Sequence, residues 1–170
     1  MPSAPVPDPA PDPASGRSAL ERLLRPRSLA IVGASPEPMS IGGNVLGNVE
    51  RFGWTGPLHL VSRSRDVIGG RPTVRTIDDL PAGVDVVVLV LPGAAVREAV
   101  AACARRGVGG VVVFAAGFGE LGEEGRHEQE AIARIAREAG IALLGPNCLG
   151  LVNFADSVPL TFEPIQPQPL

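Results

Sequence analysis

Short segments that are apolar at every position most constrain how this 170-residue chain can fold. The clearest runs from Asp85 to Pro92 and reads Asp-Val-Val-Val-Leu-Val-Leu-Pro. A strand that faces water on one side alternates apolar and polar residues, whereas a continuous β-branched run indicates a strand covered on both faces, as in a parallel sheet. Similar short runs occupy residues 28–33, 58–61, 110–115 and 141–144. We therefore expect these five segments to form the buried strands of one sheet.

Helical patterns lie between most of these segments. Ser18 and Glu21 have the spacing of a capping box and predict a short helix that ends before Pro26. Residues 42–51, 94–106 and 123–139 place apolar side chains on one helical face, and a glycine follows each of them. Strands that alternate with helices predict an open, doubly wound parallel α/β sheet, built as a single three-layer domain.

Proline is concentrated at the two ends of the chain. Six of the 18 prolines lie within residues 1–13 and four within residues 159–170. Because proline lacks an amide donor and restricts the residue before it, we expect a disordered Pro-rich tail over 1–16 and a Pro-rich linker or tail over 159–170. The folded domain is then expected over residues 17–158.

Charge and residue usage exclude several functions. With three of the 18 acids in the two end segments, 15 acids face 15 arginines in the remainder, so the excess positive charge of a nucleic-acid-binding surface is missing. The chain has no lysine and no tyrosine, which excludes a Walker-A loop, a Schiff base and a Tyr–Lys dehydrogenase pair. No apolar run is long enough for a membrane span, and no secretory signal is visible, so we expect a cytoplasmic protein with no membrane partner.

The cysteines and histidines do not form a catalytic or metal-binding pattern. Cys103 and Cys148 lack metal or disulfide spacing, and no basic side chain next to Cys148 would activate its thiol. We expect Cys103 in the core, His59 partly buried on a strand and His127 exposed on a polar helix. The sequence thus predicts no metal site and no catalytic residue.

The loop after the first strand is the first candidate ligand site. In doubly wound sheets the ligand lies at the carboxyl ends of the strands. This loop runs over residues 33–43 and contains Gly33, Ser35, Ser40, Gly42 and Gly43, so it combines a tight turn, hydroxyl donors and free amides at a helix N-terminus. A phosphate group is the expected occupant. The loop does not match the Gly-x-Gly-x-x-Gly dinucleotide fingerprint, because the glycine that follows Gly33 is Gly42.

The end of the second strand carries arginines in place of the acid that binds ribose hydroxyls in NAD proteins. Between residues 51 and 75 there are five arginines and one acid, Asp66. The arginines are Arg51, Arg63, Arg65, Arg71 and Arg75. Arginine binds phosphate with two parallel hydrogen bonds, so this composition disfavours NAD and favours a ligand with an additional phosphate.

Three further loops should reach the same edge of the sheet. They are residues 91–93, 116–120 and 145–150, and each contains glycine. Gly117 and Gly119 permit close approach of the backbone to a ligand. Phe118 is equally consistent with an aromatic cover for an adenine ring and with a core side chain.

Four motifs, taken in order, resemble one known family. They are Ser28–Ser35 with Ser40–Gly43, the segment ending in Gly70-Arg71-Pro72, Ala115-Ala-Gly-Phe-Gly-Glu120, and Gly145-Pro-Asn-Cys-Leu-Gly-Leu-Val-Asn153. Together they resemble the N-terminal CoA-binding domain of the NDP-forming acyl-CoA synthetases. That family includes ADP-forming acetate–CoA ligase and is similar to the α subunit of succinyl-CoA synthetase. The resemblance covers about residues 27–163.

The resemblance implies a Rossmann-like domain that binds coenzyme A through its ADP part. Phosphates would be held by Gly33, Ala34, Ser35, Ser40, Gly42 and Gly43, whereas Pro92 and Ala116, Gly117 and Phe118 would line the path of the nucleotide or pantetheine. The family commonly has Asn-Pro-Lys at the end of the second strand, where this chain reads Ser62-Arg63-Ser64. Arg63 or Arg65 would then replace the lysine at the 3′-phosphate.

The resemblance also implies what the chain would need from other domains. Family chemistry joins an acid to CoA through a phosphorylated histidine and an ATP-grasp module, and neither has a counterpart among the motifs here. We therefore expect this chain to bind CoA without completing a ligase cycle, together with further ligase domains or subunits. Two alternatives remain: an NADP-binding domain of a reductase or redox sensor, and a stand-alone regulatory domain.

Overall fold

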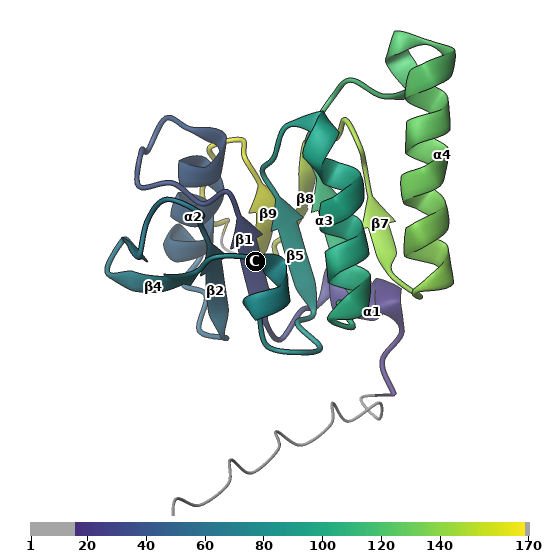
Figure 1. The fold of residues 1–170 in the computed structure, drawn as a ribbon. Coiled ribbons are helices and arrows are strands. Elements are labelled where there is room, and N and C mark those ends of the chain that lie inside the picture. Colours follow the sequence, from purple (N-terminus) through teal and green to yellow (C-terminus); the bar gives the residue numbers. More distant parts are fainter. Residues whose placement is uncertain (1–15, 169–170) are drawn as a thin grey trace, which may run out of the picture.

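The five predicted strands lie side by side in a seven-stranded sheet with the order β3-β4-β2-β1-β5-β6-β7 (Figure 1). A computed structural model describes residues 16–168 of the protein. The five are β1 (Leu29–Val32), β2 (Leu58–Val61), β5 (Val86–Leu89), β6 (Gly110–Val113) and β7 (Ala142–Leu144). All neighbours among them are parallel, and every residue of β1, β5 and β6 is buried. The predicted two-sided parallel sheet is confirmed.

Helices cover both faces of this sheet, as Figure 1 shows. They are α1 (Ala19–Leu24), α2 (Ile41–Arg51), α3 (Gly93–Arg105) and α4 (Glu123–Glu138), with short 3-10 helices η1 (Ile77–Asp79) and η2 (Gly119–Leu121). Apolar residues of α3 and α4 pack in one core cluster, and those of α1 and α2 pack in a second cluster on the opposite face. Helix and strand bounds agree with the sequence expectations to within a few residues, and the three-layer α/β domain is confirmed.

An ion-pair cluster attaches the N-terminal helix to the sheet. Asp85, directly before β5, is 7% exposed, and its carboxylate lies 2.8 Å from Arg17 Nη1 and 2.6 Å from Arg22 Nε. The same carboxylate accepts a hydrogen bond from the backbone amide of Arg27 at 2.7 Å. Since all three partners come from residues 17–27, this one acid holds the start of the described chain against the amino ends of the strands.

Two strands beside β2 are absent from the sequence expectations. They are β3 (Val67–Ile68) and β4 (Arg71–Val74), an antiparallel pair whose second strand runs parallel to β2. Arg71 and Pro72 are exposed, and Thr73 and Val74 are half-buried, so no apolar run marks this segment. The strand conformation of β4 depends on its hydrogen bonds to β2. Such a dependence on a partner strand cannot be predicted from the periodicity of the sequence.

A second antiparallel pair lies outside the main sheet. β8 (Gly150–Asn153) pairs with β9 (Val158–Thr161), and all four residues of β9 are buried against the α2 face. Ordered packing therefore continues past the boundary expected at residue 158. The prolines suggested a tail, but Pro159 is tolerated because β9 pairs with a strand on one side only. Residues 1–15 of the predicted N-terminal tail and residues 169–170 lie outside the described residues.

Candidate functional site at the carboxyl edge of the sheet

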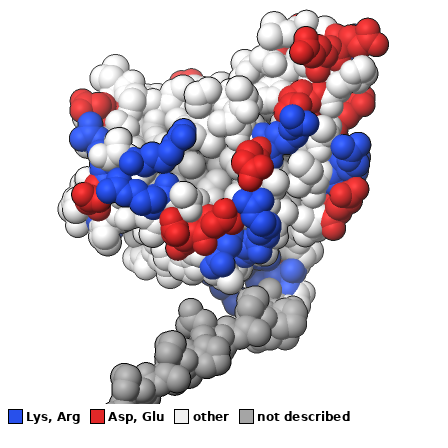
Figure 2. All heavy atoms as spheres, in the orientation of Figure 1, with Lys and Arg blue, Asp and Glu red and all other residues white. Residues whose placement is uncertain are grey.

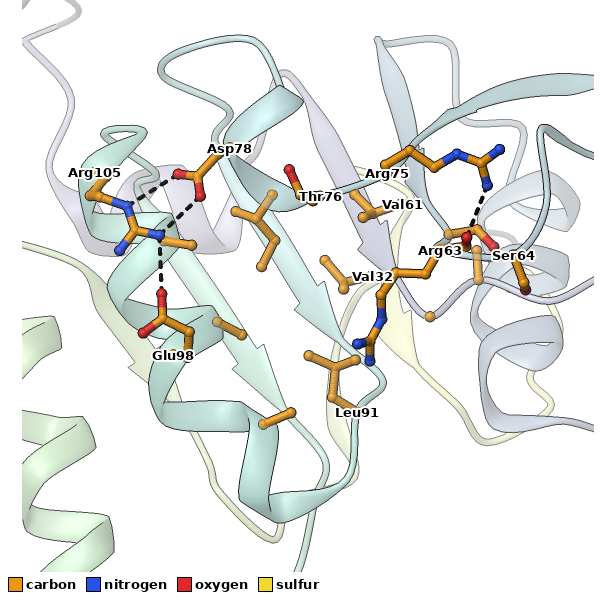
Figure 3. Close-up of a pocket in the computed structure, with 17 residues that line it drawn as sticks. Val32, Val61, Arg63, Ser64, Arg75, Thr76, Asp78, Leu91, Glu98 and Arg105 are labelled. Atoms are coloured by element: carbon orange, nitrogen blue, oxygen red, sulfur yellow. Dashed lines mark hydrogen bonds and ion pairs between the residues drawn. The ribbon is translucent and has the colours of Figure 1, made fainter.

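A cavity of about 550 Å³ opens where β1, β2 and β5 end (Figure 3). Its floor is apolar and comprises Val32, Val61, Ile77 and Leu91 with the small side chains Ala95, Ala99 and Ala102 of α3. Its rim is polar. Of the residues predicted from the sequence, Gly33, Ala34 and Arg63 line this cavity. An apolar floor with a few convergent polar groups is the usual composition of a small-molecule site.

The glycines after β1 are required first by the packing of their own loop. Gly33 has φ +82°, and a Cβ there would lie 2.1 Å from the carbonyl oxygen of Val90. A Cβ on Gly42 would lie 2.1 Å from the oxygen of Gly33, and one on Gly43 would lie 1.9 Å from that of Glu37. These glycines, which the sequence predicted to make room for a ligand, are needed for the close packing of the loop backbone itself. This packing brings the N-terminus of α2 against the end of β1.

Both serine hydroxyls of this loop accept hydrogen bonds within it, and that of Ser40 also donates one. Ser40 is the N-cap of α2: its Oγ accepts a hydrogen bond from the Gly43 amide at 3.0 Å and donates one to the Glu37 carbonyl at 2.8 Å. Ser35 Oγ accepts from the Glu37 amide at 3.1 Å. Within the described residues, the amides of Ile41 and Gly42 have no such acceptor. These two amides and the Ser35 hydroxyl, which donates to no acceptor among the described residues, are therefore among the donors available for an anion.

The five arginines near β2 and β4 divide into two groups. Figure 2 shows basic side chains gathered over this part of the molecule, with acids among them. Arg51 donates to Asn48 and to the Ile165 carbonyl, Arg71 pairs with Glu50 at 3.5 Å, and Arg75 pairs with Asp66. Between residues 16 and 168, Arg63 and Arg65 are the members of this group whose guanidinium has neither an ion pair nor a hydrogen bond.

Arg63 and Arg65 differ in where they lie. Figure 3 shows the side chain of Arg63 extending from the end of β2 across the cavity toward Leu91. Arg65 is exposed and does not line the cavity. Of the two arginines that the sequence left open as phosphate ligands, the structure brings Arg63 to the site.

The far end of the cavity carries polar residues that sequence reasoning missed. Asp78 follows β4 and binds Arg105 of α3 with hydrogen bonds of 3.1 and 2.9 Å, and Arg105 also pairs with Glu98 at 3.1 Å (Figure 3). The hydrogen bond from Arg105 holds the pKa of the Asp78 carboxyl below its ordinary value. Asp78 is 20 positions from Glu98 and 27 from Arg105 in the sequence, and only the packing of η1 beside α3 brings it to these two residues of the helix.

The loop after β6 borders a second cavity, of about 820 Å³, between α3 and α4. Ala116 and Gly117 are exposed at its wall. Phe118 is only 1% exposed and packs in the core cluster of α3 and α4. Of the two roles that the sequence left open for it, the core side chain is the one seen in the structure. The amide of Gly117 donates to the Glu120 carboxylate at 2.6 Å, and this bond lowers the pKa of Glu120.

The remaining predicted positions lie around these cavities without forming a reactive group. Pro92 is the N-cap of α3 and lines neither cavity. Burial raises the pKa of the Cys148 thiol, which donates to the Val113 carbonyl at 3.4 Å, and burial raises the pKa of Cys103 to about 12. His59 is half-buried and its pKa is lowered by burial, whereas His127 is exposed.

Within residues 16–168, no three side chains of the metal-binding types gather into a possible ion site. None of the described helices has the length and apolar content to cross a bilayer.

Several known proteins are similar to this chain in sequence and fold. A trans-feruloyl-CoA synthase from an unknown prokaryotic organism is 41% identical over 84% of this chain and 20% of its own length. The α subunit of ADP-forming acetate–CoA ligase II from Pyrococcus furiosus is 33% identical over 84% of this chain and 31% of its own. The solved structure of the dinucleotide-forming acetyl-coenzyme A synthetase 1 of Ca. Korarchaeum cryptofilum, with phosphate and ADP, superposes with a TM-score of 0.78 at 33% identity, over 84% of this chain and 30% of that one.

The chain thus spans between a fifth and a third of the length of these relatives. A family model described as a CoA binding domain matches residues 27–153, which include β1 through β8 and both cavities. On sequence and on fold, this chain belongs to the CoA-binding domain family.

Proposed function

We propose that the chain binds coenzyme A at the carboxyl edge of its sheet, with the adenosine part in the 550 Å³ cavity, as the CoA-binding module of an ADP-forming acyl-CoA synthetase. The observation that carries this proposal is the position of Arg63. Its guanidinium lies over an apolar floor with no acid partner among residues 16–168. An unpaired cation beside an apolar cavity is the environment that a phosphorylated nucleoside requires.

The residues present fit the chemistry of coenzyme A. The apolar floor offers a surface for the adenine ring, and the amides of Ile41 and Gly42 at the start of α2 would bind the pyrophosphate. Arg63 would bind the 3′-phosphate in place of the lysine found in the family. Ala116 and Gly117 would then lie along the pantetheine.

Ligand titration by calorimetry tests this proposal against its NADP alternative. We expect the 170-residue chain to bind CoA more tightly than dephospho-CoA, NADPH or NADH. The alternative draws on the same Arg63, because NADPH also carries a phosphate on its adenosine ribose. Tight binding of NADPH with none of CoA would overturn our proposal and support the alternative.

Replacement of Arg63 tests the assignment of the 3′-phosphate. A charge-assisted hydrogen bond is worth about 1.5–3 kcal/mol, so R63A should weaken CoA binding roughly 10- to 100-fold. Dephospho-CoA lacks the 3′-phosphate, and its affinity should change by no more than about threefold. R71A is the matched control, because Arg71 is an exposed arginine of the same group that pairs with Glu50 and does not line the cavity. Equal losses for CoA and dephospho-CoA in R63A would contradict the assignment.

The wider reaction is also part of the proposal. The relatives named above are ligases or synthases several times longer than this chain, so we propose that acyl transfer requires further domains or subunits. We expect the chain to bind CoA but to form no acetyl-CoA when it is incubated alone with acetate, ATP and CoA. Formation of acetyl-CoA by the purified chain would contradict the proposal that acyl transfer requires further domains or subunits.

A further inference from the structure

The side chain of Arg75 is hydrogen-bonded to the turn that carries Arg63. Its Nη1 donates to the carbonyl oxygens of Arg63 at 3.0 Å and Arg65 at 3.4 Å, and its Nη2 pairs with the carboxylate of Asp66. Figure 3 shows this guanidinium directed at the backbone of Arg63, whereas the Arg63 side chain leaves in the other direction, toward Leu91. Arg75 borders the cavity, but its donors face the turn.

The rest of the turn over residues 62–66 is held by a side chain of its own and by β4, beginning with the Ser62 amide, which donates to the Val74 carbonyl at 2.9 Å. Ser62 Oγ accepts from the Arg65 amide at 3.2 Å, and the Thr73 amide of β4 donates to the Asp66 carbonyl at 3.0 Å. Thr73 Oγ1 donates to the Arg65 carbonyl. The carbonyl of Arg63 has Arg75 as its partner among the described residues. β4 therefore holds the residues on either side of Arg63, whereas the Arg63 carbonyl itself is held by Arg75.

Charge pairing separates the two arginines further. Asp66 is the one acid between residues 51 and 75, and it is paired with Arg75. Arg63 therefore has no acid partner among the described residues, whereas the Arg75 guanidinium is paired with Asp66 and makes three hydrogen bonds to the turn. Such an arrangement orients a cation toward a ligand without adding a second one that would bind any anion.

We propose that Arg75 is a positioning residue for phosphate specificity: it fixes the 62–66 turn so that Arg63 faces the 3′-phosphate of coenzyme A. This inference rests on the proposed function. It adds that the preference for CoA over dephospho-CoA depends on a side chain that does not itself bind the phosphate.

A double-mutant cycle tests this role. The readout is the ratio of the dissociation constants of dephospho-CoA and CoA, measured for the wild type, R63A, R75A and the double variant R63A/R75A. We expect R75A to reduce this ratio by about fivefold while the affinity for dephospho-CoA changes little, because the turn loosens and Arg63 no longer faces the phosphate. In the R63A background the second substitution should leave the ratio unchanged. R71A is again the control and should keep the wild-type ratio.

A second variant covers the case in which R75A does not fold. In R75K a single ammonium group replaces the planar fork, so it cannot serve both carbonyls and the Asp66 carboxylate in the same geometry. We expect it to fold and to show an intermediate ratio. Faster amide hydrogen exchange over residues 62–66 in R75K would show directly that the turn has loosened.

The possible results separate the two proposals. If the wild type does not prefer CoA to dephospho-CoA, the phosphate role of Arg63 in the proposed function fails. If the wild type shows the preference but R75A and R75K keep it, or if the losses in R63A and R75A multiply in the double variant, the positioning role of Arg75 is overturned and the proposed function stands.

Discussion

Replacement of Asp85 by alanine is expected to destabilise the protein by about 3–5 kcal/mol, the usual result of removing one partner of a buried ion pair. The side chains of Asp85 and Arg17 are 11% and 8% exposed, and Arg22 is 18% exposed. Without the carboxylate, two arginines and the Arg27 amide would lose a shared acceptor in a place that water reaches poorly. Urea unfolding at pH 7, followed by circular dichroism, measures this loss.

The pH dependence of the unfolding free energy of D85A gives a second test of the role of Asp85. Burial alone would raise the pKa of Asp85, but hydrogen bonds from the Arg27 amide and from two arginine side chains outweigh burial and lower it. A lowered folded-state pKa stabilises the protein above the unfolded value of about 3.9, and this contribution is lost as the pH falls through the folded pKa. The stability difference between wild type and D85A should therefore be constant near neutral pH and narrow only in acid.

D78A is the matched control for D85A. Asp78 also pairs with an arginine, but the side chains of Asp78 and Arg105 are 52% and 51% exposed. Water and salt screen an exposed pair, so its removal should change stability far less than D85A does. Equal stabilities of D85A and wild type would show that the cluster at the amino ends of the strands does not anchor helix α1.

Replacement of Gly42 by alanine is the second prediction with a large expected effect. The new Cβ would lie 2.1 Å from the carbonyl oxygen of Gly33, so either the loop or the N-terminus of α2 must move. Forced overpacking of this kind costs about 3 kcal/mol. Because the shift displaces the amides of Ile41 and Gly42, we also expect CoA affinity to fall by at least about tenfold, the factor that corresponds to 1.4 kcal/mol.

Gly47 provides a control within the same helix. A Cβ at Gly47 would meet nothing within 4 Å, so G47A adds the helix propensity of alanine without a clash. It should stabilise the protein by about 0.5–1 kcal/mol and leave CoA binding unchanged. Thermal unfolding and calorimetry of the two variants measure both effects. Similar behaviour of G42A and G47A would mean that the loop after β1 is not packed against α2 as described.

Some of the fold could be predicted from the sequence because its strands are buried on both faces. Residues 86–89 and 110–113 are continuous apolar runs, and such runs identify central parallel strands without any knowledge of their neighbours. β4 and β9 were not predicted, because their conformation depends on a partner elsewhere in the chain. β4 is a polar strand that follows the edge of β2, and β9 contains a proline that a sequence pattern counts against a strand.

The candidate site could be predicted only in part. Composition identified the excess of arginine near the second strand, but it could not separate Arg63 from Arg75, because the two differ in their partners rather than in residue type. The hydroxyl of Ser40 was expected to hold a phosphate, and in the structure it caps α2. Asp78 meets Arg105 only through the packing of η1 against α3, so local sequence contained no signal for that pair, whereas Glu98 and Arg105 share one helix.

The sequence by itself determined the layered α/β architecture, the edge of the sheet where a ligand is expected and the family to which the chain belongs. These properties follow from local patterns, namely continuous apolar runs, glycine positions and motif order, which are present before the chain folds. Only the tertiary structure decided which charges are free. Asp66, Glu50 and Asp85 each pair with specific arginines, and such pairing depends on distances of a few ångströms between segments that folding brings together. Asp66, the acid nearest to Arg63 in sequence, is paired with Arg75, and Arg63 lines the cavity without an acid partner among residues 16–168.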